Sequence, residues 1–195
     1  MRTNCILVFV CLFLCVSCQL LAQSDSSSIS KNKVVYFNNF LAGGIFGKTE
    51  SGSGPSFLMT HGVRMNRLAL GAGVGFDSYL DWKTLPVIGS IYFDFAKIKQ
   101  NAFFILFNAG YSNAWRIKGE EPIFDEQVRG GEVINSMVGY RIRANQFSLY
   151  ISAGHKFQKV QRSYNPNPWS SIPGSKISIE EDMNRMVVQI GFGLH

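Results

Sequence analysis

Five charged residues occupy positions from which they could form a buried ion network. They are Arg64, Asp94, Arg141, Lys156 and Arg185, and each lies on the small-residue side of a segment in which apolar and small residues alternate. Arg64, Asp94 and Arg141 also lie close to short turns, so the Asp94 carboxylate can pair with one or both arginines. In an interior without bulk water an unpaired charge is costly, so we predict pairing that serves stability. An ion or substrate path along these charges is the alternative.

The two internal histidines are the remaining candidates for acid–base chemistry. His61 lies beside Thr60, and His155 lies near Ser152. Residues two apart on a strand share a face and residues three apart do not, so neither histidine shares a strand face with a nearby serine. The sequence has no nucleophile elbow, phosphate-binding loop or clustered metal-ligand spacing. We therefore predict no catalytic residue, no cofactor and no metal site.

Aromatic residues in two long connections are candidates for contact with a partner. Phe124 lies in the charged segment 116–131, and Tyr164 and Trp169 lie in the proline-containing segment 162–182. Binding residues concentrate on loops that a rigid scaffold positions. Solvated loops with aromatic residues near a lipid surface are the alternative interpretation.

The elements that must position these residues are strands, because apolar residues recur at every second position. In residues 68–76 (LALGAGVGF) one face is continuously apolar and the other carries only alanine and glycine. Such alternation predicts a β-strand. Eight strands are predicted, at residues 34–47, 56–65, 67–76, 84–96, 101–115, 132–143, 146–161 and 183–194. Short turns and longer loops alternate between them, as in an up-and-down barrel.

The start of the chain predicts export. Arg2 precedes the apolar run 5–14, and Ala22 offers a cleavage site, so residues 1–22 are predicted to be a signal peptide. The Ser-rich segment 23–33 is a predicted disordered lead-in, and residues 34–195 are the predicted barrel. All four cysteines lie in the leader, which leaves the mature chain without thiols. Lipidation at Cys18 is the alternative to cleavage after Ala22.

The formal net charge of +6 could indicate nucleic acid, but the basic residues are scattered and mixed with acidic ones. We therefore predict no nucleic-acid partner and place the basic residues near anionic lipid headgroups. The glycine-rich face argues in the same direction. A soluble barrel would carry charged side chains on its outer face, whereas glycine suits the interior of a narrow barrel whose apolar side touches lipid.

The hairpin that contains LALGAGVGFDSY and LPVIGSIYFDF resembles the small outer-membrane β-barrel proteins of Gram-negative bacteria, the OmpA/OmpX-like barrel class. The resemblance covers most of the mature chain. It implies an all-β fold, an eight-stranded antiparallel up-and-down transmembrane β-barrel in the bacterial outer membrane. It also implies two partners, the outer-membrane lipids and the barrel-insertion machinery. That machinery usually reads a terminal aromatic residue, and here the aromatic residue, Phe192, lies three positions before the end.

The predicted function is a non-enzymatic surface or envelope role, with an unknown extracellular partner as a candidate ligand of the loops. One alternative is an exported, soluble, lipocalin-like barrel that holds an apolar ligand inside. A second is a barrel enzyme that modifies lipid A and uses a histidine exposed to the membrane.

Overall fold

The computed structural model of the chain describes residues 34–47, 52–80, 82–117, 127–164 and 177–194. The predicted leader and lead-in lie outside the described residues. No helix in the described part is long and apolar enough to cross a membrane. Eight strands follow one another along the chain: β1 (Val34–Phe46), β2 (Gly54–Met65), β3 (Leu68–Ser78), β4 (Trp82–Ile98), β5 (Asn101–Arg116), β6 (Gln127–Ala144), β7 (Phe147–Tyr164) and β8 (Ile177–Leu194).

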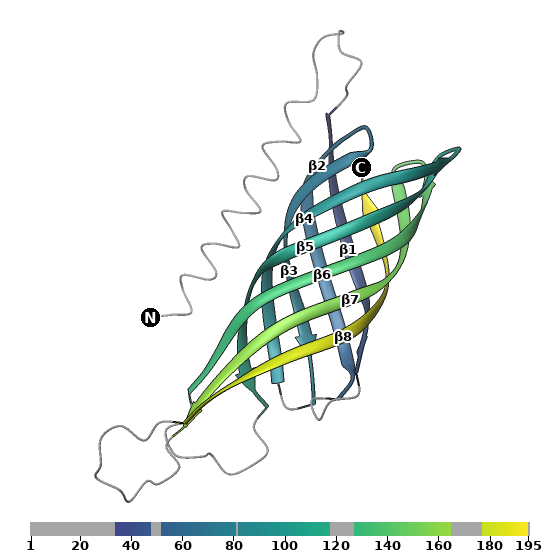
Figure 1. Ribbon diagram of the computed structural model, residues 1–195. Helices are drawn as coiled ribbons and strands as arrows, with labels where there is room; N and C mark the ends of the chain where they lie inside the picture. The colour runs from purple at the N-terminus through teal and green to yellow at the C-terminus, as the bar shows by residue number, and fades with distance from the viewer. Residues whose placement is uncertain (1–33, 48–51, 81, 118–126, 165–176, 195) are drawn as a thin grey trace, which may run out of the picture. The chain divides into compact units, whose positions relative to one another are not determined.

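The strands form a closed barrel (Figure 1). Each strand pairs antiparallel with the next, and β8 pairs with β1 to complete the circle. In that closing pair, Asn38 lies opposite Leu194 and Phe46 lies opposite Met186. The predicted eight-stranded antiparallel up-and-down barrel is therefore confirmed.

Three two-residue turns join β2 to β3, β4 to β5 and β6 to β7, and we call this end of the barrel the turn end. Each turn contains one residue with positive φ, namely Asn66 at 54°, Lys99 at 55° and Asn145 at 54°. Two-residue hairpins need such residues because their backbone twist must match that of the strands. The short turns were predicted, and we call the opposite end of the barrel the loop end.

One predicted loop is shorter than expected. Residues 77–83 were assigned to a loop, but β3 continues to Ser78 and β4 begins at Trp82. The connection is held by a hydrogen bond from the backbone N–H of Tyr79 to the carbonyl of Trp82, with 2.7 Å between N and O. Asp77 and Trp82 continue the alternation of their strands, and both side chains are buried in the interior.

The last three strands are longer than predicted. Each of β6, β7 and β8 has 18 residues, whereas β1, β2 and β3 have 13, 12 and 11. β7 and β8 pair as far as Tyr164 opposite Ile177, well beyond the last pair of β8 with β1 (Figure 1). Most of the added residues are polar or glycine, and the aliphatic ones are Val128, Ile177 and Ile179, so the apolar alternation is weak there. Hydrogen bonding between backbones maintains these strands where the hydrophobic pattern ends.

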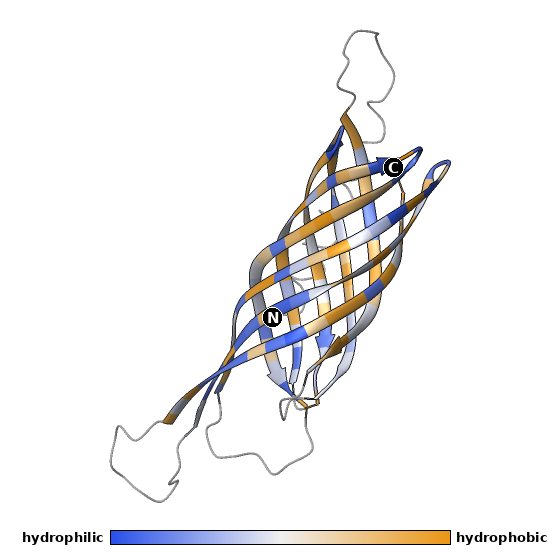
Figure 2. Ribbon diagram, turned by 45° about the vertical axis from the view of Figure 1, so that its right-hand side comes forward, coloured by the Kyte–Doolittle hydropathy of each residue, from blue (hydrophilic) through white to orange (hydrophobic). Residues whose placement is uncertain are grey.

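The apolar faces of the strands point outward. Leu70, Val74, Ile91 and Phe93 have exposed fractions of 43%, 51%, 46% and 44%, although all four lie within strands. Figure 2 shows the alternation of apolar and polar residues along the strands. The glycine face points inward, and a Cβ added to Gly191 would lie 2.0 Å from the backbone oxygen of Phe40. The absence of a side chain there lets two backbones approach closely. The predicted orientation of the two faces is confirmed.

The lipocalin-like alternative fails on this orientation, because such a barrel would bury its apolar face and expose its polar one. Aromatic residues near the strand ends lie on both sides of the wall. Phe37, Tyr79 and Trp82 are inside, with exposed fractions of only 1%, 2% and 3%. Phe93 and Trp115 face outward.

Candidate functional site

The barrel interior holds two polar networks, one toward each end. At the turn end, Arg64 of β2 and Arg141 of β6 both donate to the same carboxylate oxygen, Oδ2 of Asp94 in β4. The distances are 2.9 Å from Arg64 Nη1 and 2.7 Å from Arg141 Nη2. We call these three residues the turn-end triad. Asp94 is fully buried, and the triad carries a net charge of +1.

Aromatic rings close off the turn-end triad from the middle of the barrel. The Arg64 guanidinium lies 5.7 Å from the centre of the Phe37 ring, a cation–π contact. Phe37 packs edge-on against Tyr92 at 5.6 Å, and Phe104 packs edge-on against Tyr150 at 5.8 Å. Tyr92 and Phe104 join the two pairs at 5.9 Å. These four rings form a layer that separates the triad from the residues beyond it.

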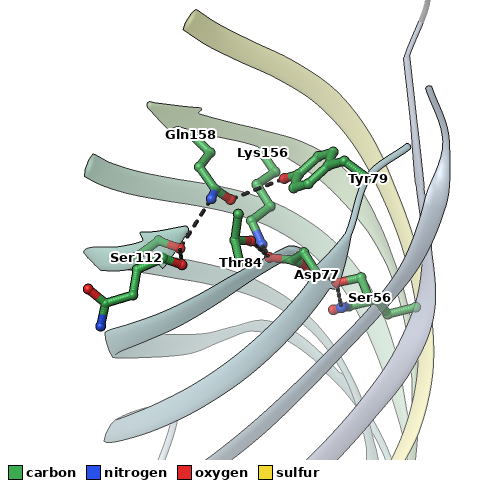
Figure 3. A network of polar contacts seen from close by, with 9 residues as sticks. Ser56, Asp77, Tyr79, Thr84, Ser112, Lys156 and Gln158 are labelled. Atoms are coloured by element: carbon green, nitrogen blue, oxygen red, sulfur yellow. Dashed lines mark hydrogen bonds and ion pairs between the residues drawn. The ribbon is translucent and has the colours of Figure 1, made fainter. Parts of the chain in front are cut away.

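The second network lies toward the loop end and centres on Asp77 of β3 (Figure 3). Its carboxylate pairs with the Lys156 ammonium and accepts a hydrogen bond from Ser56 at 2.6 Å. Thr84 approaches the same carboxylate at 3.5 Å, and Gln189 donates to Ser56 at 3.1 Å. We call these five residues the loop-end network. Asp77, Thr84 and Lys156 come from three different strands, so the network ties the barrel wall together.

Sequence reasoning missed Asp77. It assigned this residue to a loop and left Lys156 without a partner. The available signal was the alternation itself, because Asp77 follows Gly71, Gly73 and Gly75 at the same spacing of two. The structure brings together Arg64, Asp94 and Arg141, whereas Lys156 contacts Asp77 instead. The fifth predicted charge, Arg185, also lies inside, with an exposed fraction of 1%.

A chain of hydrogen bonds continues from this region. The Tyr79 hydroxyl donates to Oε1 of Gln158 at 3.1 Å, and Nε2 of Gln158 donates to the Ser112 hydroxyl, also at 3.1 Å (Figure 3). Burial, reinforced by the negative charge of Asp77, raises the pKa of Tyr79, so this phenol stays protonated and remains a donor. The Arg185 guanidinium lies 5.9 Å from the centre of the Tyr79 ring and donates to the backbone oxygen of Asn184.

The interior leaves almost no free space. The cavity beside Lys156 has a volume of about 10 Å³ and is lined by Ser56, Asn108, Asn135 and Gln189 among others. This volume matches a single water molecule. Ligand pockets for small molecules are usually about 300–1,000 Å³, so the cavity is far too small for an apolar ligand. Many of the described inward side chains are fully buried, among them Leu41, Tyr92, Leu106 and Val187.

The histidines lie on the outward side, as predicted. His61 Nδ1 is 2.5 Å from the hydroxyl of Tyr36 on β1. His155 lies opposite Ser136 across the β6–β7 pair, and both residues are exposed. Reasoning on single strands overlooked Ser136, because the register between strands is needed to find it. No hydrogen bond joins the His155 and Ser136 side chains, and Ser152 points into the barrel.

The predicted loop contacts are only partly visible. Tyr164 is the last residue of β7, and the Arg162 guanidinium lies 5.5 Å from the centre of its ring. Phe124 and Trp169 lie outside the described residues. Nearby, Lys159 and Glu180 form an ion pair at 3.0 Å, which raises the pKa of Lys159. Within the described ranges, no group of three His, Cys, Asp or Glu side chains could hold a metal ion.

Solved structures resemble this barrel closely enough to establish its fold. Neisserial surface protein A (NspA) matches with a TM-score of 0.55 and 13% sequence identity, over 83% of this chain and 98% of that one. The outer membrane protein OprG from Pseudomonas aeruginosa matches with a TM-score of 0.56 and 12% identity, over 82% and 94%. The chain has the fold of the small outer-membrane β-barrels.

A third structure with this fold was determined in lipid. The outer membrane protein AlkL, solved by solid-state NMR in DMPC bilayers, matches with a TM-score of 0.53 and 12% identity, over 88% of this chain and 94% of that one. No family model and no curated protein matches the sequence. At 12–13% identity, the three structures show the fold of this chain, and its function has to be argued from its own residues.

Proposed function

We propose that this protein is a non-enzymatic outer-membrane barrel with a surface or envelope role, exported by a cleaved signal peptide. One observation carries the proposal, namely an apolar outer face combined with a filled interior. Ile91, Ile151 and Ile190 have exposed fractions of 46%, 47% and 55% on successive parts of the barrel wall. Water-exposed apolar patches of this extent are rare on soluble monomers, whereas lipid would cover them.

Fractionation tests the membrane assignment. The protein is expected in the outer-membrane fraction, resistant to alkaline or high-salt washing and released only by detergent. Mass spectrometry of the purified protein is expected to show a mature chain that begins at Gln23. A chain that begins at a lipid-modified Cys18 would instead support lipidation. Release of the protein into the soluble periplasm would overturn the proposal.

The filled interior argues against a channel. Eight strands leave little room at the axis of a barrel, and here the rings of Phe37, Tyr92, Phe104 and Tyr150 close off the turn end. Purified protein inserted into planar bilayers is expected to produce no stable ionic conductance. A reproducible conductance that changes on substitution of Asp94 or Asp77 would favour the alternative of an ion path.

The absence of enzymatic activity is part of the proposal. Support comes from the two outward histidines, since His61 is engaged with Tyr36 and His155 has no hydrogen bond to Ser136. Substitution of His61 and His155 by glutamine is expected to leave lipid A profiles unchanged, as is deletion of the protein. A changed profile in both strains would establish the lipid-modifying alternative.

A partner, where there is one, is expected to contact the loop end. This end carries Tyr164. Phe124 and Trp169, which lie outside the described residues, belong in the sequence to the connections that follow β5 and β7. Whole cells that display the protein provide a test. Replacement of Tyr164 and Trp169 by serine is expected to reduce binding of a captured ligand without lowering the amount of inserted barrel.

A further inference from the structure

The exposed charges of the barrel are distributed unequally between its two ends. The turn end carries Arg67, Lys97, Lys99 and Arg143, all exposed and all in or beside the two-residue turns. We call these four residues the turn rim. In the described part of the chain, none of them forms an ion pair with a carboxylate. Among the residues that the structure describes, the acidic residue at this end is Asp94, which is buried and already shared by two arginines.

The described charges at the loop end are of both signs. Its described basic residues are mixed with acidic ones, and Glu180, Glu181 and Asp182 follow one another along β8. Lys159 pairs there with Glu180. Among the described residues, Lys159 at the loop end thus has a carboxylate partner, whereas the four residues of the turn rim form no ion pair. Within the described ranges, the turn rim therefore presents exposed positive charge without a paired carboxylate.

The turn rim also lies directly beside apolar surface. Met65 precedes the turn that holds Arg67, and its exposed fraction is 42%. Ile98 lies between Lys97 and Lys99 with an exposed fraction of 52%, and Phe147 follows the turn after Arg143 with 58%. Apolar side chains at these positions contact acyl chains, so the basic groups lie at the depth of the lipid headgroups. Long basic side chains reach that depth readily.

We propose that the turn rim binds the phosphate groups of anionic phospholipids in the leaflet that surrounds it. The inference rests on the proposed membrane location. Arg67, Lys97, Lys99 and Arg143 come from the three hairpins at the turn end, so they can contact several headgroups, and the net positive charge of the buried triad adds to their field. The site is selective for anionic over zwitterionic phospholipid because the latter carries its own ammonium group beside the phosphate.

Lipid retention measures this selectivity. The protein is inserted into vesicles of equal parts phosphatidylglycerol and phosphatidylcholine, extracted gently, and its retained lipids are quantified by mass spectrometry. A single basic residue near an anionic surface gives about a fivefold preference for anionic over zwitterionic lipid. The wild type is expected to retain phosphatidylglycerol at least about fivefold over phosphatidylcholine, and added salt is expected to reduce this ratio because it screens charge.

Two variants with the same loss of charge locate the effect. Replacement of Arg67, Lys97, Lys99 and Arg143 by glutamine is expected to bring the retained ratio close to one. The matched control replaces four loop-end residues, Lys83, Arg116, Arg129 and Arg162, by glutamine and is expected to keep the wild-type ratio. Enrichment that survives in the rim variant, or that disappears equally in both variants, would overturn the proposal.

Failure of the membrane assignment has a different signature. Vesicle flotation and the shift in gel mobility on heating show whether each variant is inserted and folded. A wild type that fails to float with the vesicles contradicts the proposed membrane location itself. A wild type that inserts but retains both phospholipids equally contradicts only the lipid site at the turn rim.

Discussion

Substitution of Asp94 by asparagine is expected to destabilise the barrel strongly. Arg64 and Arg141 both contact Asp94 Oδ2, at 2.9 and 2.7 Å, so their guanidinium groups lie within about 6 Å of each other. Two unit charges at that separation repel by about 3 kcal/mol at an effective dielectric constant of about 20. Asparagine removes the attraction that offsets this repulsion. Loss of one partner from a buried ion pair typically costs about 3–5 kcal/mol, and we expect D94N to fall in that range.

Equilibrium unfolding in urea, with the protein in lipid vesicles, measures this loss. The exposed substitution Asp182→Asn is the matched control, and its effect is expected to stay within about 0.5 kcal/mol. The double variant D94N/R141M removes one of the two facing positive charges and is expected to be more stable than D94N. The reasoning is refuted by a D94N protein as stable as the D182N control, or by effects of D94N and R141M that simply add.

Three further perturbations test other parts of the structure by the same unfolding measurement. Asp77→Asn leaves Lys156 buried without its counter-ion and is expected to lower the free energy of unfolding by about 3–5 kcal/mol. The double variant D77N/K156M is expected to recover a large part of this loss. A double variant no more stable than D77N would contradict the ion pair. Gly191→Ala places a methyl group against the Phe40 carbonyl and is expected to cost about 1–3 kcal/mol. The outward Gly89→Ala is expected to be neutral, because the added methyl group would lie 3.9 Å from the Ala109 carbonyl oxygen. Ile151→Arg puts a charge on the lipid face and is expected to cost about 2–4 kcal/mol. Its control, Leu80→Arg, lies beyond the strands and is expected to have little effect. Equal effects of the two substitutions would argue against a lipid-covered wall.

Period-two alternation was sufficient to predict the barrel, its faces and the five inward charges. Arg64, Asp94 and Arg141 each lie in a segment where apolar residues recur at most of the outward positions. The alternation fixes the side of the strand, and the nearby turn fixes the depth in the barrel. Both quantities are local, so a single sequence contains them. The proximity of these three side chains could therefore be expected before their distances were known.

Other features depend on information that is not local. Asp77 was placed in a loop because aspartate is common in turns and depleted in strands, yet here Lys156 and Ser56 compensate for its charge. The loop-end extensions of β6, β7 and β8, residues 127–131, 162–164 and 177–182, were missed because most of their residues are polar or glycine. Ser136 faces His155 only through the register of β6 on β7. Pairing between strands decides the extensions and the His155–Ser136 proximity, whereas for Asp77 the propensity of aspartate for turns outweighed the alternation that continues through it.

The geometry of the two ion networks argues that both serve stability. On β6, Met137 lies between Arg141 of the turn-end triad and Asn135, which lines the small cavity beside Lys156. On β4, Tyr92 separates Asp94 from the loop-end side, and on β5 Leu106 lies in the same middle region. Met137, Tyr92 and Leu106 are all buried, with exposed fractions of 1% or less. Asn39, Thr60, Ser90 and Asn108 are buried beside these residues, so the middle of the barrel is mixed in polarity. The stability argument therefore rests on the ion pairs, because Asp94 meets two guanidinium groups and Asp77 meets the Lys156 ammonium within the barrel wall. Charges neutralised where they lie avoid the cost of an unpaired buried charge.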